Sequence, residues 1–130
     1  MDKKLDKWLA KNIMGWKLRN KSQYYQRPYG DSNYVLHVDD WFPTDNWLQV
    51  KELIDIIDNE YLADFGYSVN HHHSYGWRTH LDIRLLNDEE IYVSAKAETS
   101  ELSVCRAIKK AFKKLKEYED EREKKDKTHA

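Results

Sequence analysis

The chain has 130 residues, of which 40% are hydrophobic and 35% are charged, so it suits one soluble domain with a small core and a densely ionic surface. Its 22 basic and 23 acidic side chains give a net charge of -1, which provides no overall field to attract DNA or an anionic membrane. We therefore expect neither nucleic acid nor a membrane as a partner. A single cysteine excludes disulfide and zinc-cluster frameworks. With no apolar leader or membrane-length segment, the sequence predicts a cytoplasmic protein.

The N-terminal residues predict a short helix. Asp2 is a suitable N-cap, and apolar side chains recur at helical spacing as far as Met14. Gly15 follows at a place where a left-handed residue commonly ends a helix. Residues 16–34 are polar and rich in tyrosine, and they form either a long excursion or a weak hairpin. Residues 34–40 form either a brief edge strand or, as we prefer, an extended arm that leads to the next helix.

The middle of the chain predicts a second helix followed by a sheet. Thr44 is the expected N-cap, and apolar side chains then recur on one face of residues 47–62. The apolar period next shortens to two, which predicts strands at residues 67–73, 77–85 and 90–97. Short turns at residues 74–76 and 87–88 join these strands, so they should form an antiparallel meander.

The last strand leads directly into a third helix, which Thr99 can cap and whose apolar stripe ends near Leu115. Cys105 lies on this stripe, so we expect a buried thiol and not a nucleophile. We predict one domain over residues 1–117, followed by a charged tail at residues 118–130 that is solvated or a frayed helix. The predicted fold class is α+β, a three-stranded antiparallel meander with a possible fourth short edge strand, packed by helices in an α/β/α sandwich.

Three segments carry a family resemblance. They are LAKNIMGWK at residues 9–17, FPTD at residues 42–45 with Val50, and AET at residues 97–99 followed by CRA at residues 105–107. In order and spacing they resemble the phage ABA sandwich family, small proteins of phages and prophages. The resemblance implies a small α/β/α layered domain encoded by a phage or an integrated prophage. It implies no catalytic residues, and the matched positions look like helix ends, caps and core.

A mixture of aromatic and basic side chains is the first candidate site. Flat rings can stack on bases while arginine holds phosphates, so this mixture suits a nucleotide or a stretch of single strand. The alternative is a loop whose tyrosines fold back as a lid over a lean core. The candidate ligand-binding residues are Tyr24, Tyr25, Arg27, Tyr29, Tyr34, His37 and Trp41, to which Trp77 and Arg78 could be added.

Histidines near the first turn of the meander form a weak candidate metal site. His71 and His73 share one face of a strand, and His80 lies across the turn. No carboxylate is clearly placed to complete the site, so the alternative is a polar hairpin exposed to water. The lysines within residues 109–116 follow helical spacing opposite the apolar stripe, and we interpret them as a solvated helix face. The alternative is a nucleic-acid footprint, which the neighbouring acidic residues weaken. We expect no cofactor.

Together these patterns favour binding over catalysis, because no pair of carboxylates or of carboxylate and histidine is legible as an acid and base. The preferred hypothesis is a non-enzymatic phage or prophage protein that counters host defence by sequestering a nucleotide-derived immune signal. The alternative is a protein–protein interaction module that inhibits or adapts a host or phage protein. A nucleotide-processing enzyme is the third hypothesis, and a homo-oligomer could serve any of them.

Overall fold

The computed structural model describes six stretches of the chain: residues 2–18, 23–26, 35–60, 64–74, 76–84 and 89–128. The α-helices in these stretches are α1 (Lys3–Asn12), α2 (Trp47–Glu60) and α3 (Ser100–Thr128). One antiparallel sheet consists of β1 (Lys17–Leu18), β2 (Tyr24–Gln26) and β3 (Val35–His37). The other consists of β4 (Asp64–His72), β5 (Gly76–Arg84) and β6 (Glu90–Ala97). Two short 3-10 turns, η1 (Val38–Asp40) and η2 (Pro43–Asp45), lie between β3 and α2.

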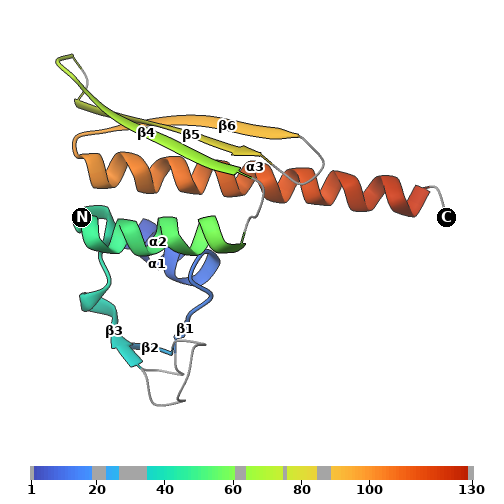
Figure 1. Ribbon diagram of the computed structural model, residues 1–130. Coiled ribbons are helices and arrows are strands. Elements are labelled where there is room, and N and C mark those ends of the chain that lie inside the picture. The colour runs from blue at the N-terminus through green and yellow to red at the C-terminus, as the bar shows by residue number, and fades with distance from the viewer. Residues whose placement is uncertain are drawn as a thin grey trace.

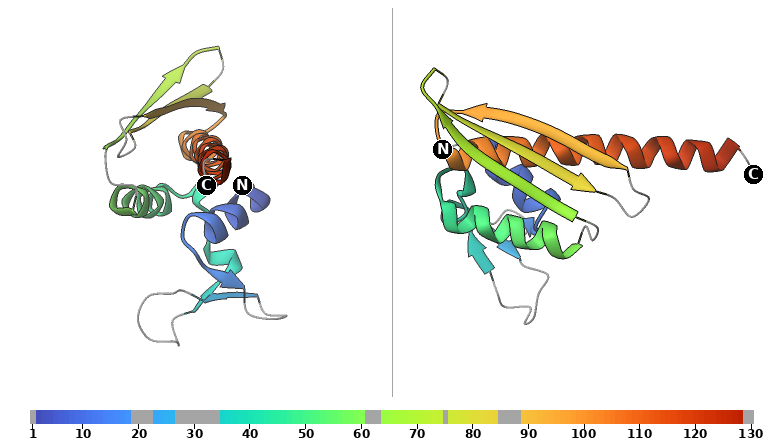
Figure 2. Two further views of the ribbon diagram at one scale, coloured as in Figure 1. Left: turned by 90° about the vertical axis from the view of Figure 1, so that its right-hand side faces the viewer. Right: turned by 45° about the horizontal axis from the view of Figure 1, so that its top comes forward.

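The elements form layers, as Figures 1 and 2 show. Helix α3 lies along one face of the β4–β6 sheet, α1 and α2 lie on the far side of α3, and the small β1–β3 sheet lies beyond them. The predicted α+β class and the three-stranded meander packed by helices are confirmed. In the described part of the chain, however, the helices cover one face of the meander, so the expected second helical layer is not on its other face.

The reason for this one-sided packing is the alternation of side chains along β5 and β6. Leu81 and Ile83 pair across the strands with Val93 and Ile91, and all four are buried against the helices. The residues between them are mostly exposed on the opposite face, among them Tyr92 with 59% of its surface accessible. Such alternation is typical of an antiparallel sheet with one face in water. The turn predicted at residues 87–88 lies outside the described residues.

The Tyr-rich stretch forms part of the second sheet. Strands β1 and β2 pair antiparallel, so of the two alternatives for residues 16–34, a long excursion or a weak hairpin, the described ends agree with the hairpin. The possible fourth strand was expected to pair with the edge of the meander, and this pairing is wrong. Strand β3 does form, but Tyr25 pairs with Leu36, which joins β3 to β2 and not to β4–β6. The hairpin offers an unpaired edge close by in sequence, and β3 fills it.

Three of the predicted helix ends are confirmed. The Asp2 carboxylate accepts the backbone N–H of Leu5 at 3.1 Å, and the Thr99 hydroxyl accepts that of Leu102 at 3.2 Å. Gly15 has φ of 71°, the left-handed conformation that glycine adopts without strain. The contacts of Asp2 and Thr99 satisfy backbone N–H groups that the first turn of a helix leaves without an intrahelical partner.

The predicted cap of α2 is wrong. Thr44 lies inside η2, and the side chain of Asn46 accepts the backbone N–H of Gln49 at 3.2 Å instead, so α2 begins two residues later than expected. The Thr44 hydroxyl accepts the backbone N–H of Asp2 at 3.0 Å, and the backbone N–H of Thr44 donates to the Asp6 carboxylate at 3.0 Å. Thr44 therefore joins η2 to α1.

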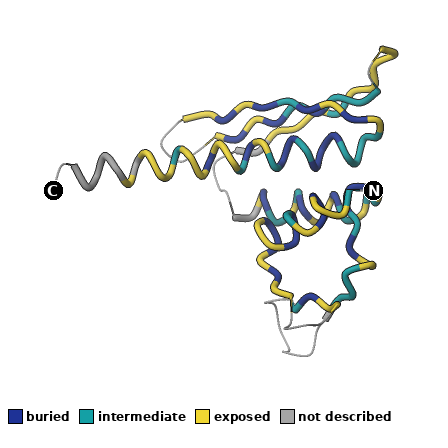
Figure 3. The backbone as a smooth tube through the Cα atoms, turned by 180° about the vertical axis from the view of Figure 1, so that it is seen from behind, coloured by how far each residue is buried: buried dark blue, intermediate teal, exposed yellow. Residues whose placement is uncertain are grey.

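Helix α3 continues through the predicted tail as far as Thr128, and Figure 3 shows its outer part extending beyond the body of the molecule. Leu115 is the last residue of α3 described as buried, which agrees with the predicted end of the apolar stripe. None of the helices in the described stretches combines the length and apolar character needed to cross a membrane.

Candidate functional site

The predicted ligand-binding residues fall into two groups on opposite sides of the helical layer. Tyr24 and Tyr25 lie on β2, His37 ends β3, and Trp41 lies between η1 and η2, whereas Trp77 and Arg78 lie on β5 (Figure 1). The remaining candidates, Arg27, Tyr29 and Tyr34, lie outside the described residues. Among the described candidates, the structure therefore does not bring Arg78 together with the aromatic residues of β2 in one site.

The aromatic group beside β2 is largely core. Tyr25 and Trp41 have 3% and 2% of their surface accessible, and both pack against Trp16, with ring centroids 5.9 and 4.6 Å away. Burial raises the pKa of the Tyr25 hydroxyl. For these rings the structure agrees with the alternative reading, in which they cover a lean core, and their faces are not an open stacking platform.

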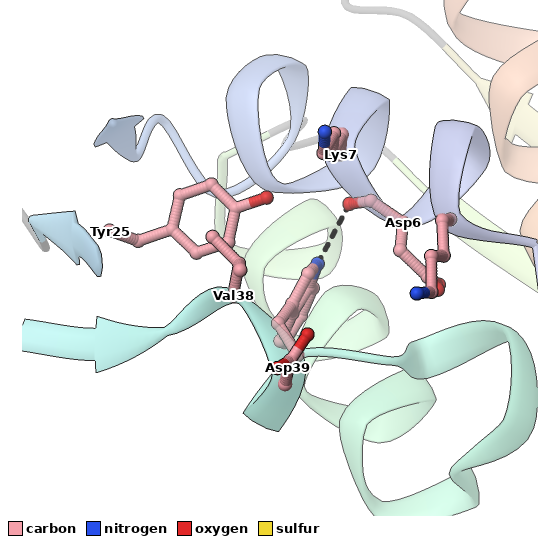
Figure 4. A pocket seen from close by; sticks show the side chains of 7 residues that line it. Asp6, Lys7, Tyr25, Val38 and Asp39 are labelled. Carbon is pink, nitrogen blue, oxygen red and sulfur yellow. Dashed lines mark hydrogen bonds between the residues drawn. The ribbon is translucent and has the colours of Figure 1, made fainter. Parts of the chain in front are cut away.

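A cavity of about 330 Å³ nevertheless lies beside this cluster (Figure 4). Trp41 borders this cavity, and its indole N–H donates to the backbone carbonyl of Asp6 at 2.9 Å. The cavity is lined by Lys3, Asp6, Lys7, Tyr25, Val38, Asp39 and Trp41. Two lysines face two carboxylates there, so the cavity has no excess of positive charge for a phosphate.

Tyr24 and His37 are held by local contacts. Their rings meet edge to face with centroids 5.0 Å apart. The His37 Nδ1 accepts the backbone N–H of Asp39 at 3.1 Å, so its Nε2 carries the proton in the neutral ring and donates to the Gln23 amide oxygen at 3.2 Å. The Nδ1 contact thus stabilises the η1 turn, and the Nε2 contact joins the end of β3 to the residue before β2.

The histidine candidates do not converge on a metal. His71 and His73 lie side by side, with ring centroids 6.1 Å apart, and His71 also contacts Trp77. His80 pairs with Ser68, an odd number of residues from His71 along β4, so it belongs to the other face of the sheet. There its Nδ1 is hydrogen-bonded to the Tyr92 hydroxyl at 2.6 Å. Within the described residues no three metal-ligating side chains gather.

Arg78 belongs to a different feature, a groove of about 600 Å³ at the β6 edge of the sheet, lined by residues of α3, β5 and β6, which we call the basic groove. Its lining combines six cationic side chains with two small residues: Arg78, Lys96, Arg106, Lys109, Lys110 and Lys113, with Ser94 and Ala95. Among the described residues that line it, none carries a carboxylate. A groove lined by one sign of charge concentrates its field and attracts ligands of the opposite sign.

The groove follows from how α3 docks on the sheet. The apolar stripe of α3 is buried under β5 and β6, including Val104, Ile108 and Ala111. Basic residues flank this stripe, so docking places them along β6. Sequence reasoning treated the lysines as a solvated face, because their alignment with Arg78 and Lys96 depends on strand register. The available signal was the recurrence of basic residues every four positions beside the apolar stripe.

Cys105 is buried in the core, as predicted. Burial raises the pKa of its thiol far above the usual range, and the nearby carboxylates of Asp6 and Glu101 raise it further. The thiolate form is therefore strongly disfavoured, which makes Cys105 unsuitable as a nucleophile.

Comparison with known proteins yields a structural likeness and no family. No family model matches the sequence, and no curated protein gives a significant match. The fold is similar to that of a phage protein from Bacillus cereus ATCC 14579, with a TM-score of 0.60 over 87% of this chain and 89% of that one. The two sequences are 13% identical, so the likeness establishes a shared fold alone.

Proposed function

We propose that this chain is a phage- or prophage-encoded, non-enzymatic binding protein that captures a nucleotide-type anion in the basic groove. The observation that carries the proposal is that six cationic residues from α3, β5 and β6 line one groove. One of them, Lys109, also places its ammonium group over the Trp8 ring, 5.7 Å from the centroid. The similarity of fold to a phage protein supports the suggested origin. Arg78 is the residue that sequence reasoning and the groove have in common.

The groove suits phosphate for two physical reasons. Arginine offers a planar fork of donors that matches two phosphate oxygens, and lysine adds a compact charge with three donors. In addition, the hydrogen bonds from Arg106 and Lys110 to β6 hold two of the cations in place before a ligand arrives. Side chains that are already ordered lose less entropy when they bind.

Capture without conversion agrees with the residues that line the groove. Among those described, none is a histidine or a carboxylate that could act as a general base. His80, the cross-strand partner of Ser94, does not line the groove, and its Nδ1 is hydrogen-bonded to the Tyr92 hydroxyl. A phage protein that holds a nucleotide-derived immune signal in this way would act in counter-defence. It would lower the free concentration of the signal in proportion to its own abundance.

An alternative function, binding of a host or phage protein, is favoured by the open face of the meander. On that face Tyr92 is 59% exposed and lines a shallow depression of about 380 Å³ together with His80 and Asp82. Exposed tyrosines are enriched at protein interfaces. Affinity purification from infected cells tests this alternative, because it requires a stoichiometric protein partner that a Tyr92→Ser variant no longer retains.

The capture proposal is tested by calorimetric titration and native mass spectrometry with cyclic nucleotides and ADP-ribose-type nucleotides. We expect binding at micromolar concentration or tighter, weakened by added salt because the contacts are ionic. The Lys110→Glu/Lys113→Glu variant should lose binding, since two cations of the groove become anions.

A matched control is Lys51→Glu, which reverses an exposed charge on α2, away from the groove. This variant should bind as the parent protein does, and circular dichroism should show that both variants remain folded. No binding of any nucleotide at micromolar concentration, or equal loss in the two variants, would overturn the proposal.

A further inference from the structure

Three basic side chains of α3 reach the exposed edge of the meander in a regular series. Arg106 donates to the carbonyl of Lys96 at 2.9 Å, Lys110 to that of Ser94 at 3.0 Å, and Lys114 to that of Tyr92 at 3.4 Å. Each step advances four residues along α3 and goes back two residues along β6. Helix and strand therefore run antiparallel, with one cation for every second residue of the strand.

The series stays in register because the two repeats have nearly the same length. Four residues of helix rise about 6 Å, and two residues of strand span about 6.6 Å. The charges are thus spaced evenly over about 12 Å between Arg106 and Lys114. An ammonium group has three donors, and one carbonyl occupies one of them. Arg106 and Lys110 can therefore hold their positions on β6 and still bind anions in the groove, and Lys114 continues the row beyond the residues that line it.

Two further features define what such a row recognises. Among the described residues that line the basic groove, none has an aromatic ring, so the groove offers phosphate contacts without a surface for stacking bases. Beyond Lys116 the exposed face of α3 turns acidic, with Glu117, Glu119 and Asp120. Repulsion by these carboxylates limits the anion-binding row at that end.

We infer, as an extension of the proposed function, that the ligand of the basic groove is an extended phosphodiester chain of a few nucleotides, bound through its backbone without base preference. The evenly spaced cations match the repeat of charge along such a chain better than the compact charge of a mononucleotide. The same chemistry occurs in a cyclic oligonucleotide signal and in single-stranded nucleic acid. The net charge of -1 gives no sign of this site, because acidic residues elsewhere in the chain balance its positive charge.

The test is a length series of oligothymidylates, from one to eight nucleotides, measured by fluorescence anisotropy at several salt concentrations. Two further phosphates in contact should tighten binding about tenfold or more, and the gain should level off near about four nucleotides. Oligoadenylates should bind equally well. With about three phosphates neutralised, the logarithm of the binding constant should fall with the logarithm of salt with a slope of about -2.

Lys113→Gln should reduce the salt slope by about 1, whereas Lys116→Gln, the same change on α3 outside the groove, should leave it unaltered. A cyclic trinucleotide serves as the second arm: tighter binding than the linear trinucleotide assigns the site to a cyclic signal, and weaker binding assigns it to a strand. Equal affinity for mono- and tetranucleotides would overturn the inference but leave nucleotide capture standing. Tighter binding of polyglutamate would also overturn it, and a lack of all nucleotide binding would overturn both.

Discussion

At the residue scale, buried polar groups link segments that are distant in sequence. The Thr79 and Ser103 hydroxyls, both fully buried, are hydrogen-bonded to each other at 2.7 Å and so connect β5 to α3. Asp6 has the same role between α1 and η2, since its carboxylate accepts the backbone N–H of Thr44. Such groups are costly to bury without partners, and for that reason they fix how the elements dock.

Asp6 should make the stability of the protein depend on pH. Burial raises the pKa of its carboxyl, so the folded state binds a proton more readily than the unfolded state does. The free energy of unfolding should therefore fall as pH rises from the ordinary aspartate pKa through the raised one. Asp6→Asn keeps an oxygen for the Thr44 N–H but does not ionise, so it should remove this loss.

Chemical unfolding of both proteins from acidic to neutral pH measures the effect. We expect the Asn variant to gain stability relative to the parent as pH rises through this window, and to keep that gain at neutral pH. If the free energies of unfolding of the two proteins changed in parallel with pH, ionised Asp6 would not destabilise the folded state.

At the element scale, local pattern was enough to predict the helices and the meander, since apolar period and caps such as Asp2 and Thr99 depend on neighbours in sequence. Local pattern could not predict which segments pair when they lie far apart in the sequence. The partner of β3, and the choice of Asn46 over Thr44 as cap, depend on contacts with segments many residues away. The basic groove was missed for the same reason, because it forms when α3 and β6 lie side by side.

Gly76, at the start of β5, should be the most sensitive glycine of the meander. Its φ is 81°, and an added Cβ would lie 2.8 Å from the carbonyl oxygen of Ala97 on β6. Gly76→Ala should therefore lower the free energy of unfolding by about 1 to 3 kcal/mol, from left-handed strain and from the clash.

Gly66→Ala on β4 is the matched control, because an added Cβ meets no atom within 4 Å there. It should be neutral or stabilise by about 0.4 to 1 kcal/mol, through a less flexible unfolded chain. Equal losses in the two variants, measured by denaturant unfolding, would contradict this account of the turn.

At the scale of the whole molecule, the basic groove and the buried aromatic cluster are separate features. The groove is lined by residues of α3, β5 and β6, whereas Trp16, Tyr25 and Trp41 pack together in the core near β2 and η1. The sequence predicted one site with both kinds of side chain, and among the described candidates Arg78 lies apart from Tyr25 and Trp41. An almost neutral protein thereby acquires one strongly positive surface.

The location of the bound ligand tests this account most directly. In a nuclear magnetic resonance titration of the labelled protein with a thymidine tetranucleotide, the backbone amides of residues 94–96 and 106–113 should shift. The resonance of the Trp41 indole N–H, which donates to Asp6 beside the aromatic cavity, should not shift. Shifts centred on Trp41 and Tyr25, with the amides of α3 unmoved, would contradict the assignment of the binding site to the basic groove.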